Sequence, residues 1–79
     1  SRVSIIKNEK TTILGTKKKH LSIFPFGADA EGVSISGAEY ECKKISLKVN
    51  FPLAVSNIFK GSPVNIEVEN GVLLIMEEI

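Results

Sequence analysis

The stretch that decides the fold is residues 64–76, VNIEVENGVLLIM. Apolar and polar residues alternate over residues 64–69, and this period of two places successive side chains on opposite faces of a β-strand. Asn70-Gly71 follows, a dipeptide that is favoured in two-residue type I′ turns. The pattern therefore predicts an antiparallel hairpin formed by residues 64–68 and 72–76.

The two faces of this hairpin are unequal. One face carries an ordinary core stripe of Val64, Ile66, Val68, Leu73 and Ile75. The other places three apolar residues of the last strand, Val72, Leu74 and Met76, beside polar residues of the preceding strand. A strand that is apolar on both faces is usually central in a doubly covered sheet or lies at an interface between chains. We therefore expect these three residues either to be covered by a short helix or to form a protein interface, as in a homodimer or with another protein.

The rest of the chain also favours strands. Isoleucine and valine number 17 against 10 leucine and alanine residues, and β-branched side chains suit a pleated surface better than a helix. Further alternation occurs over residues 3–5, 21–23, 33–35 and 45–51. Tyr40 and Cys42 are out of phase with the last of these, which indicates a β-bulge near Lys43 and Lys44. We predict a mainly β fold, a small antiparallel barrel or sandwich of five to six strands.

One segment departs from the β pattern. Residues 52–60 begin with Pro52, which suits a first helical position, and Gly61 follows at a position that suits a helix end. A short helix over 52–60 is the preferred interpretation. The alternative is a strand that carries Leu53, Val55 and Phe59 on one face, interrupted only by the polar Asn57.

Length and cysteine content limit what the chain can contain. Its 79 residues suit a single domain, 1–79. With only Cys42 and one histidine, the chain cannot form an internal disulfide or a four-ligand zinc site, so we expect no metal and no cofactor. The cysteine content and the absence of a leader-like segment predict a cytoplasmic protein. The longest apolar run is far too short for a membrane span.

Charge is unevenly distributed along the chain. Residues 1–20 hold six basic residues and one glutamate, a net charge of +5, whereas residues 61–79 hold four glutamates and no basic residue. Basic side chains bind phosphates and aromatic rings stack on bases, so the basic third predicts a site for nucleic acid. The candidate residues are Lys17, Lys18, Lys19, His20 and Phe24. The alternative is a solvated lysine loop beside core phenylalanines.

No catalytic constellation is evident. His20 and Asp29 lack a nucleophile at a suggestive spacing, and Cys42 lies in a strand-like run where a thiol usually acts as a small hydrophobic group. We therefore predict a small non-enzymatic binding module, either a nucleic-acid-binding regulatory protein or a protein-protein interaction module such as an adaptor, inhibitor or assembly subunit. No small-molecule substrate is expected.

The segment from Phe51-Pro52-Leu53 through Gly61 to the 64–75 hairpin resembles the swapped-hairpin transcription factors typified by the AbrB and MazE families. That resemblance implies an intertwined dimer that binds DNA. It covers less than half of the chain, and the helix-like segment has no basic residue before Lys60, so we assign no family from it.

Overall fold

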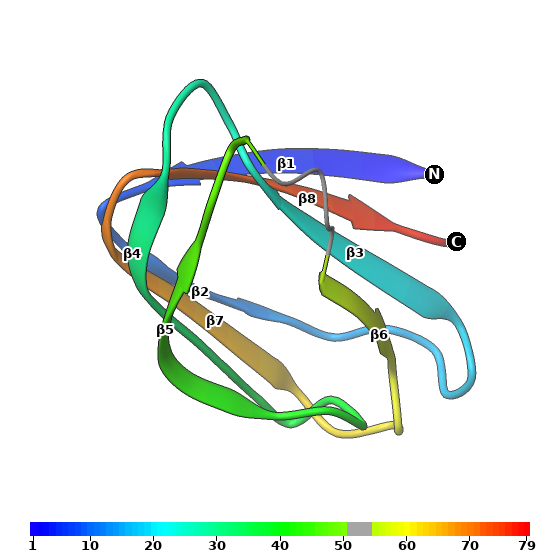
Figure 1. Ribbon diagram of the computed structural model, residues 1–79. Helices are drawn as coiled ribbons and strands as arrows, with labels where there is room; N and C mark the ends of the chain where they lie inside the picture. The colour runs from blue at the N-terminus through cyan, green and yellow to red at the C-terminus, as the bar shows by residue number, and fades with distance from the viewer. Residues whose placement is uncertain (51–54) are drawn as a thin grey trace.

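The computed structural model describes residues 1–50 and 55–79, and strands account for all the regular structure in these ranges (Figure 1). None of the described residues forms a helix long and apolar enough to cross a membrane. The eight strands are β1 (Arg2–Lys7), β2 (Lys10–Ile13), β3 (His20–Pro25), β4 (Ala30–Ser36), β5 (Cys42–Leu47), β6 (Val55–Ile58), β7 (Val64–Asn70) and β8 (Val72–Glu77).

The strands form two four-stranded antiparallel sheets. One sheet has the order β1-β8-β3-β6 and the other β2-β7-β4-β5. We call these the first and second sheets. Along the described strands the chain changes sheet at every connection except that between β4 and β5. β1 and β8 bring the two termini to the same side of the molecule (Figure 1). The predicted mainly β antiparallel fold is confirmed, with more strands than expected.

The core lies between the two sheets. Each sheet turns an apolar face inward, because alternation along a strand sends every second side chain to the same side. The predicted stripe supplies its centre, since all five of its residues are at most 1% exposed. The other buried apolar residues of this cluster are Ile6, Leu21, Ile23, Ala30, Val33, Ile35, Ala38, Leu47 and Phe59.

The predicted hairpin is wrong, although its two strands are present. β7 pairs with β2 and β4, whereas β8 pairs with β1 and β3, so the two strands lie in opposite sheets. Gly71 carries the chain across with a φ of 128°, and a Cβ at this position would lie 3.0 Å from Cα of Ala30. The alternating pattern specifies which side chains face inward but does not specify which strand is the neighbour.

The predicted helix over 52–60 is also wrong where the structure describes it. Residues 55–58 form β6, which pairs antiparallel with β3, and Phe59 bridges to Ala38. Residues 52–54 of the prediction lie outside the described residues. The alternating burial of Asn57 and Phe59 matches the strand alternative, because inward residues two apart share one face of a strand.

The bulge expected near Lys43 and Lys44 is present. Val33 pairs with Ile45 and Ile35 pairs with Cys42, so β5 holds one residue more than β4 between the two pairs. Lys44 takes a left-handed φ of 52° at this point. Because of the extra residue, the side chain of Ile45 faces the core, as the alternating pattern predicts.

Candidate functional site

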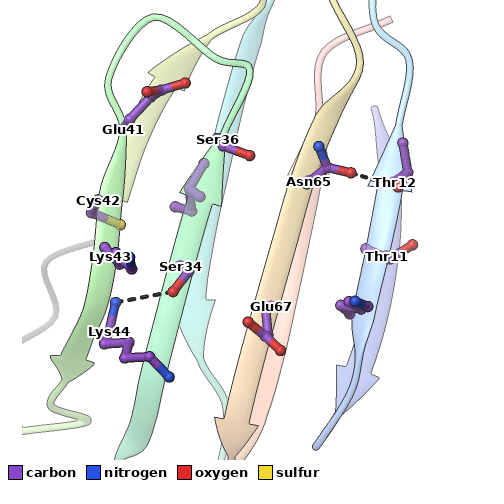
Figure 2. Close-up of a pocket in the computed structure, with 12 residues that line it drawn as sticks. Thr11, Thr12, Ser34, Ser36, Glu41, Cys42, Lys43, Lys44, Asn65 and Glu67 are labelled. Carbon is purple, nitrogen blue, oxygen red and sulfur yellow. Dashed lines mark hydrogen bonds between the residues drawn. The ribbon is translucent and has the colours of Figure 1, made fainter.

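The outer face of the second sheet carries an open groove that is lined mostly by polar residues and has a volume of about 840 Å³ (Figure 2). Cross-strand pairing builds it in two rows. Lys10, Glu67 and Ser34 form one row across β2, β7 and β4. Thr12, Asn65 and Ser36 form the next. The alternation that buries the apolar residues of β7 thus aligns its polar residues with those of both neighbouring strands.

Hydrogen bonds order part of this groove. Thr12 Oγ1 donates to Oδ1 of Asn65 over 2.8 Å, and the Lys44 backbone N–H donates to Oγ of Ser34 over 3.0 Å (Figure 2). A hydrogen bond and ion pair with Glu69 raise the pKa of the Lys44 ammonium. The groove therefore offers hydroxyl and amide groups, and beside them the ammonium groups of lysines and the carboxylates of glutamates.

Cys42 lies at the edge of the groove. Its side chain is partly buried, and burial raises the pKa of its thiol. A raised pKa lowers the thiolate fraction at neutral pH, and the thiolate is the reactive form of cysteine. This arrangement agrees with the expectation that Cys42 acts as a small hydrophobic group.

A second feature is the loop between β4 and β5, which is hydrogen-bonded to the side chain of Asn57. Asn57 is 1% exposed, and both ends of its side-chain amide bond the backbone of Tyr40. Oδ1 accepts from the Tyr40 N–H over 2.9 Å, and Nδ2 donates to the Tyr40 carbonyl over 2.7 Å. Oδ1 also accepts the N–H of Ile58 over 3.0 Å. Burying an amide without partners costs free energy, and here both its oxygen and its nitrogen have hydrogen-bond partners.

Further contacts hold the same loop. The Glu39 N–H donates to the Ile58 carbonyl, and the Gly37 N–H donates to Oε2 of Glu41. Ser62 Oγ donates to the Gly37 carbonyl over 2.8 Å. Gly37 itself has a φ of 85°. These bonds join the loop to β6 and to the connection between β6 and β7, yet Tyr40 remains 61% exposed.

The outer face of the first sheet is apolar. The predicted interface residues Val72, Leu74 and Met76 all lie here and are partly exposed. Val3 and Ile5 pair with them from β1 and are more than half exposed, and Phe24 pairs with Leu74 from β3. The prediction that these three residues lie outside the main core is therefore right. Their role as a protein interface stays a prediction.

The residues predicted to bind nucleic acid lie in the connection between β2 and β3 and along β3. Lys17, Lys18 and Lys19 lie between β2 and β3, where the Lys18 N–H donates to the Phe59 carbonyl. His20 begins β3 and its ring bonds Glu78 over 3.1 Å. Phe24 lies four residues along the same strand, roughly 13 Å away, against Leu74.

Comparison with known proteins decides the family. A family model described as thiamin pyrophosphokinase, vitamin B1 binding domain, matches residues 2–73. The chain belongs to this family. A search of curated proteins finds no match.

Several solved structures have the same fold. A thiamin pyrophosphokinase from Geobacillus thermodenitrificans superposes with a TM-score of 0.88 at 14% identity, covering 98% of this chain and 36% of that one. One from Bacillus subtilis gives a TM-score of 0.85 at 18% identity, covering 96% and 36%. A thiamin pyrophosphokinase family protein from Enterococcus faecalis gives 0.80 at 10%, covering 98% and 36%. The vitamin B1 binding domain described here thus spans little more than a third of the length of these chains.

Family membership corrects the predicted function. The nucleic-acid-binding module, the protein-protein interaction module and the absence of a small-molecule substrate are all wrong, because the family is defined by a vitamin B1 binding domain. The resemblance to swapped-hairpin transcription factors fails for the same reason. The expectation of a non-enzymatic chain needs refining, since this domain is the ligand-binding part of an enzyme family.

Sequence reasoning missed Tyr40 and Asn57. In the sequence, Tyr40 stands out only as an out-of-phase residue before the bulge, and Asn57 only as the polar break in an apolar stripe. That break was the available signal, because a polar residue at an inward position of a strand needs specific hydrogen-bond partners. The partners are 17 residues away in sequence, so only the folded structure identifies them.

Proposed function

We propose that this chain is the thiamin-binding domain of a thiamin pyrophosphokinase-type enzyme. The observation that carries the proposal is the family match over residues 2–73. The sandwich fold shared with three thiamin pyrophosphokinase structures supports it. Pyrophosphoryl transfer is then an activity of the whole enzyme, to which this domain contributes recognition of the acceptor.

The chemistry of thiamin fits a small exposed site on a rigid sandwich. Its aminopyrimidine ring donates and accepts hydrogen bonds, and its thiazolium ring is a permanent flat cation. At about 0.3 kcal/mol per non-hydrogen atom, a ligand of thiamin's size, about 18 such atoms, gains about 5 kcal/mol. This corresponds to a dissociation constant on the order of 0.1 mM.

Isothermal titration calorimetry of the chain with thiamin tests the proposal. We expect saturable 1:1 binding, with weaker binding of the free aminopyrimidine half and of the uncharged thiazole half. A mixed-sequence oligonucleotide at low salt is the control for nucleic-acid binding, and we expect that it does not bind. No heat of binding with thiamin at millimolar concentration would overturn the proposed function.

We also propose that the protein works in the cytoplasm. The support is its single cysteine, which is free and partly buried, since disulfides are characteristic of oxidising compartments. Fractionation of cells that produce the native protein checks this location.

A further inference from the structure

We propose that four lysines at one end of the sandwich, Lys17, Lys18, Lys19 and Lys60, bind the oligophosphate group of a ligand. We call these four residues the lysine cluster. The ligand class is a short chain of linked phosphates, as in a nucleoside triphosphate or in the diphosphate ester of thiamin. The inference rests on the proposed function for the source of this ligand, because an enzyme that transfers a pyrophosphoryl group takes up one oligophosphate and releases another.

Backbone hydrogen bonds bring the lysine cluster together from two distant segments. The Lys18 N–H donates to the Phe59 carbonyl over 2.8 Å, and the Phe59 N–H donates to the Lys19 carbonyl over 2.9 Å. Lys60 follows Phe59 directly in the sequence. The connection between β2 and β3 therefore lies beside the end of β6, and both segments carry lysines.

A tight turn presents two of these lysines. The Lys19 N–H donates to the Thr16 carbonyl over 3.0 Å, which places Lys17 and Lys18 at the centre of a four-residue turn. A Cβ at Gly61 would lie only 3.9 Å from Cβ of Lys17, so this turn also approaches the connection between β6 and β7. The positions of the lysine backbones are thus fixed by the fold.

Lys18 is strained in this turn. Its φ of 76° is left-handed, and a positive φ at the third position of a turn favours glycine or asparagine. The side chain is exposed, so it contributes nothing to the core that would offset this strain. Residues held in unfavourable backbone conformations cluster at functional sites, where the strain accompanies a role in binding.

The charge of the lysine cluster is not balanced by neighbouring carboxylates. The ion pairs formed among residues 1–50 and 55–79 involve Lys44, Lys48 and His20, and none of the four clustered lysines. Glu78 lies nearby, but its carboxylate accepts from the backbone N–H of His20 and contacts the ring of the same residue. Only Lys19 is partly buried. Like charges held together on a surface create a positive potential that attracts a multivalent anion.

The shape of the cluster favours an oligophosphate. Single-stranded nucleic acid is bound along a basic groove with exposed rings on which bases stack. The ring nearest the clustered lysines in the sequence of contacts, Phe59, is 1% exposed and offers no such surface. An oligophosphate concentrates its negative charge in a few linked groups, and lysine binds phosphate as a compact point charge. Four ammonium groups on two adjoining segments suit that ligand.

Isothermal titration calorimetry with inorganic tripolyphosphate, at about 0.15 M salt, tests the inference. We expect saturable binding that weakens as the salt concentration is raised. The double variant Lys17→Gln, Lys60→Gln should bind tripolyphosphate about tenfold more weakly than the parent. Thermal unfolding checks that each variant is folded at the titration temperature.

The double variant Lys7→Gln, Lys48→Gln is the matched control, because it removes the same charge from the other end of the sandwich. Lys7 pairs with Val72 at the start of β8, whereas Leu21, near the lysine cluster, pairs with Glu77 at the end of β8, roughly 17 Å away. Lys48 forms an ion pair with a carboxylate in the connection between β3 and β4. At a separation greater than the screening length of about 8 Å, the control should bind tripolyphosphate within about twofold of the parent.

Lys18→Asn separates binding from stability. Asparagine accepts a left-handed φ more readily than lysine, so this variant should unfold at the same temperature as the parent or higher. It should nevertheless bind tripolyphosphate about threefold more weakly, because one ammonium group is lost. Unchanged affinity in Lys18→Asn and in Lys17→Gln, Lys60→Gln would overturn the inference.

Two further ligands identify the source of the oligophosphate. If the cluster binds the phosphate donor, ATP should compete with tripolyphosphate and lose affinity in Lys17→Gln, Lys60→Gln. If it binds the product, thiamin diphosphate should bind about tenfold more tightly than thiamin, and the same double variant should remove this gain while leaving thiamin binding unchanged. Binding of tripolyphosphate alone, with neither ATP nor thiamin diphosphate dependent on the cluster, would mark an adventitious ion only and overturn the inference.

The remaining outcomes separate this inference from the proposed function. If tripolyphosphate does not bind, or binds equally weakly to both double variants, the lysine cluster has no such role, and thiamin binding still stands. An oligonucleotide that displaces tripolyphosphate at equal phosphate concentration also contradicts the inference, because it shows a general surface for polyanions. Failure of thiamin to bind, together with lysine-dependent binding of ATP, overturns the proposed function and leaves the phosphate site in place.

Discussion

Asn8 and Gly71 exchange two hydrogen bonds. The Gly71 N–H donates to Oδ1 of Asn8 over 2.7 Å, and the Asn8 N–H donates to the Gly71 carbonyl over 3.0 Å. Asn8 lies between β1 and β2 and Gly71 between β7 and β8, so each stands where the chain passes from one sheet to the other. The pair therefore joins two of the places where the chain crosses between the sheets, the first and the last along the described strands.

We first predict the effect of removing the Asn8 side chain. Asn8→Ala should lower the free energy of unfolding by about 2 kcal/mol, because the hydrogen bond to Gly71 is lost and alanine is strained at a φ of 48°. Asn8→Gly should cost less, about 1 kcal/mol, since glycine accepts this φ. Urea unfolding measures both. Equal stability of Asn8→Ala and the parent would contradict the role given to this pair.

The second prediction concerns Gly71. Gly71→Ala should destabilise the fold by about 2 to 3 kcal/mol, because its Cβ would lie 3.0 Å from Cα of Ala30 at an unfavourable φ. Gly27→Ala is the control: its φ is also positive, but nothing lies within 4 Å of the added Cβ. It should cost only about 1 kcal/mol of backbone strain. Two variants of equal stability would show that the approach to Ala30 does not matter.

The third prediction uses neighbouring leucines of β8. Leu73 is fully buried between the sheets, whereas Leu74 lies on the outer face of the first sheet and is partly exposed. Leu73→Glu should unfold the protein, because burying an unpaired carboxylate costs more than the about 5 kcal/mol that holds a small domain together. Leu74→Glu should remain folded and lose about 1 kcal/mol. Far-ultraviolet circular dichroism during urea unfolding distinguishes them, and a folded Leu73→Glu variant would show that the two faces are wrongly assigned.

The fourth prediction is a pH dependence at the C-terminal end of β8. Hydrogen bonds from the backbone N–H and the ring of His20 lower the pKa of Glu78 below its ordinary value of 4.5. A carboxyl whose pKa is lower in the folded state stabilises the fold above its unfolded pKa, and this contribution is lost as the pH falls through the folded pKa. The stability of the parent should therefore decrease more than that of Glu78→Gln as the pH is lowered from 5 toward 3.

Chemical denaturation at a series of pH values measures this difference. Glu39→Gln, which removes the same charge from another exposed position, is the matched control and should follow the parent. Parallel curves for the parent and Glu78→Gln would show that the contact with His20 has no net effect on stability.

The sequence by itself indicated which side chains are buried. The alternation in β7 and β8 correctly placed Val64, Ile66, Val68, Leu73 and Ile75 in the core, and the phase change before Ile45 correctly placed a bulge. Both inferences rest on the period of a strand, which is a local property of the backbone.

The sequence could not identify the contacts that hold the loop between β4 and β5. The groups that bond the backbone of Tyr40 come from β6, a segment for which the sequence pattern favours a helix. Short apolar runs are ambiguous between helix and strand. The hydrogen-bond partner of the Asn57 amide lies in a loop 17 residues away, so the sequence around Asn57 does not reveal it.

Strand pairing was likewise decided by the tertiary structure alone. Asn70-Gly71 is compatible with a tight hairpin, yet the chain uses Gly71 to cross between sheets, where Asn8 and Ala30 meet it. A hairpin would have placed both apolar stripes on one side of a single sheet. By crossing, β7 and β8 bring the same stripes together from opposite sides and close the core between them. Local sequence sets the face of each strand, whereas the choice of neighbour depends on how all eight strands together exclude water from that core.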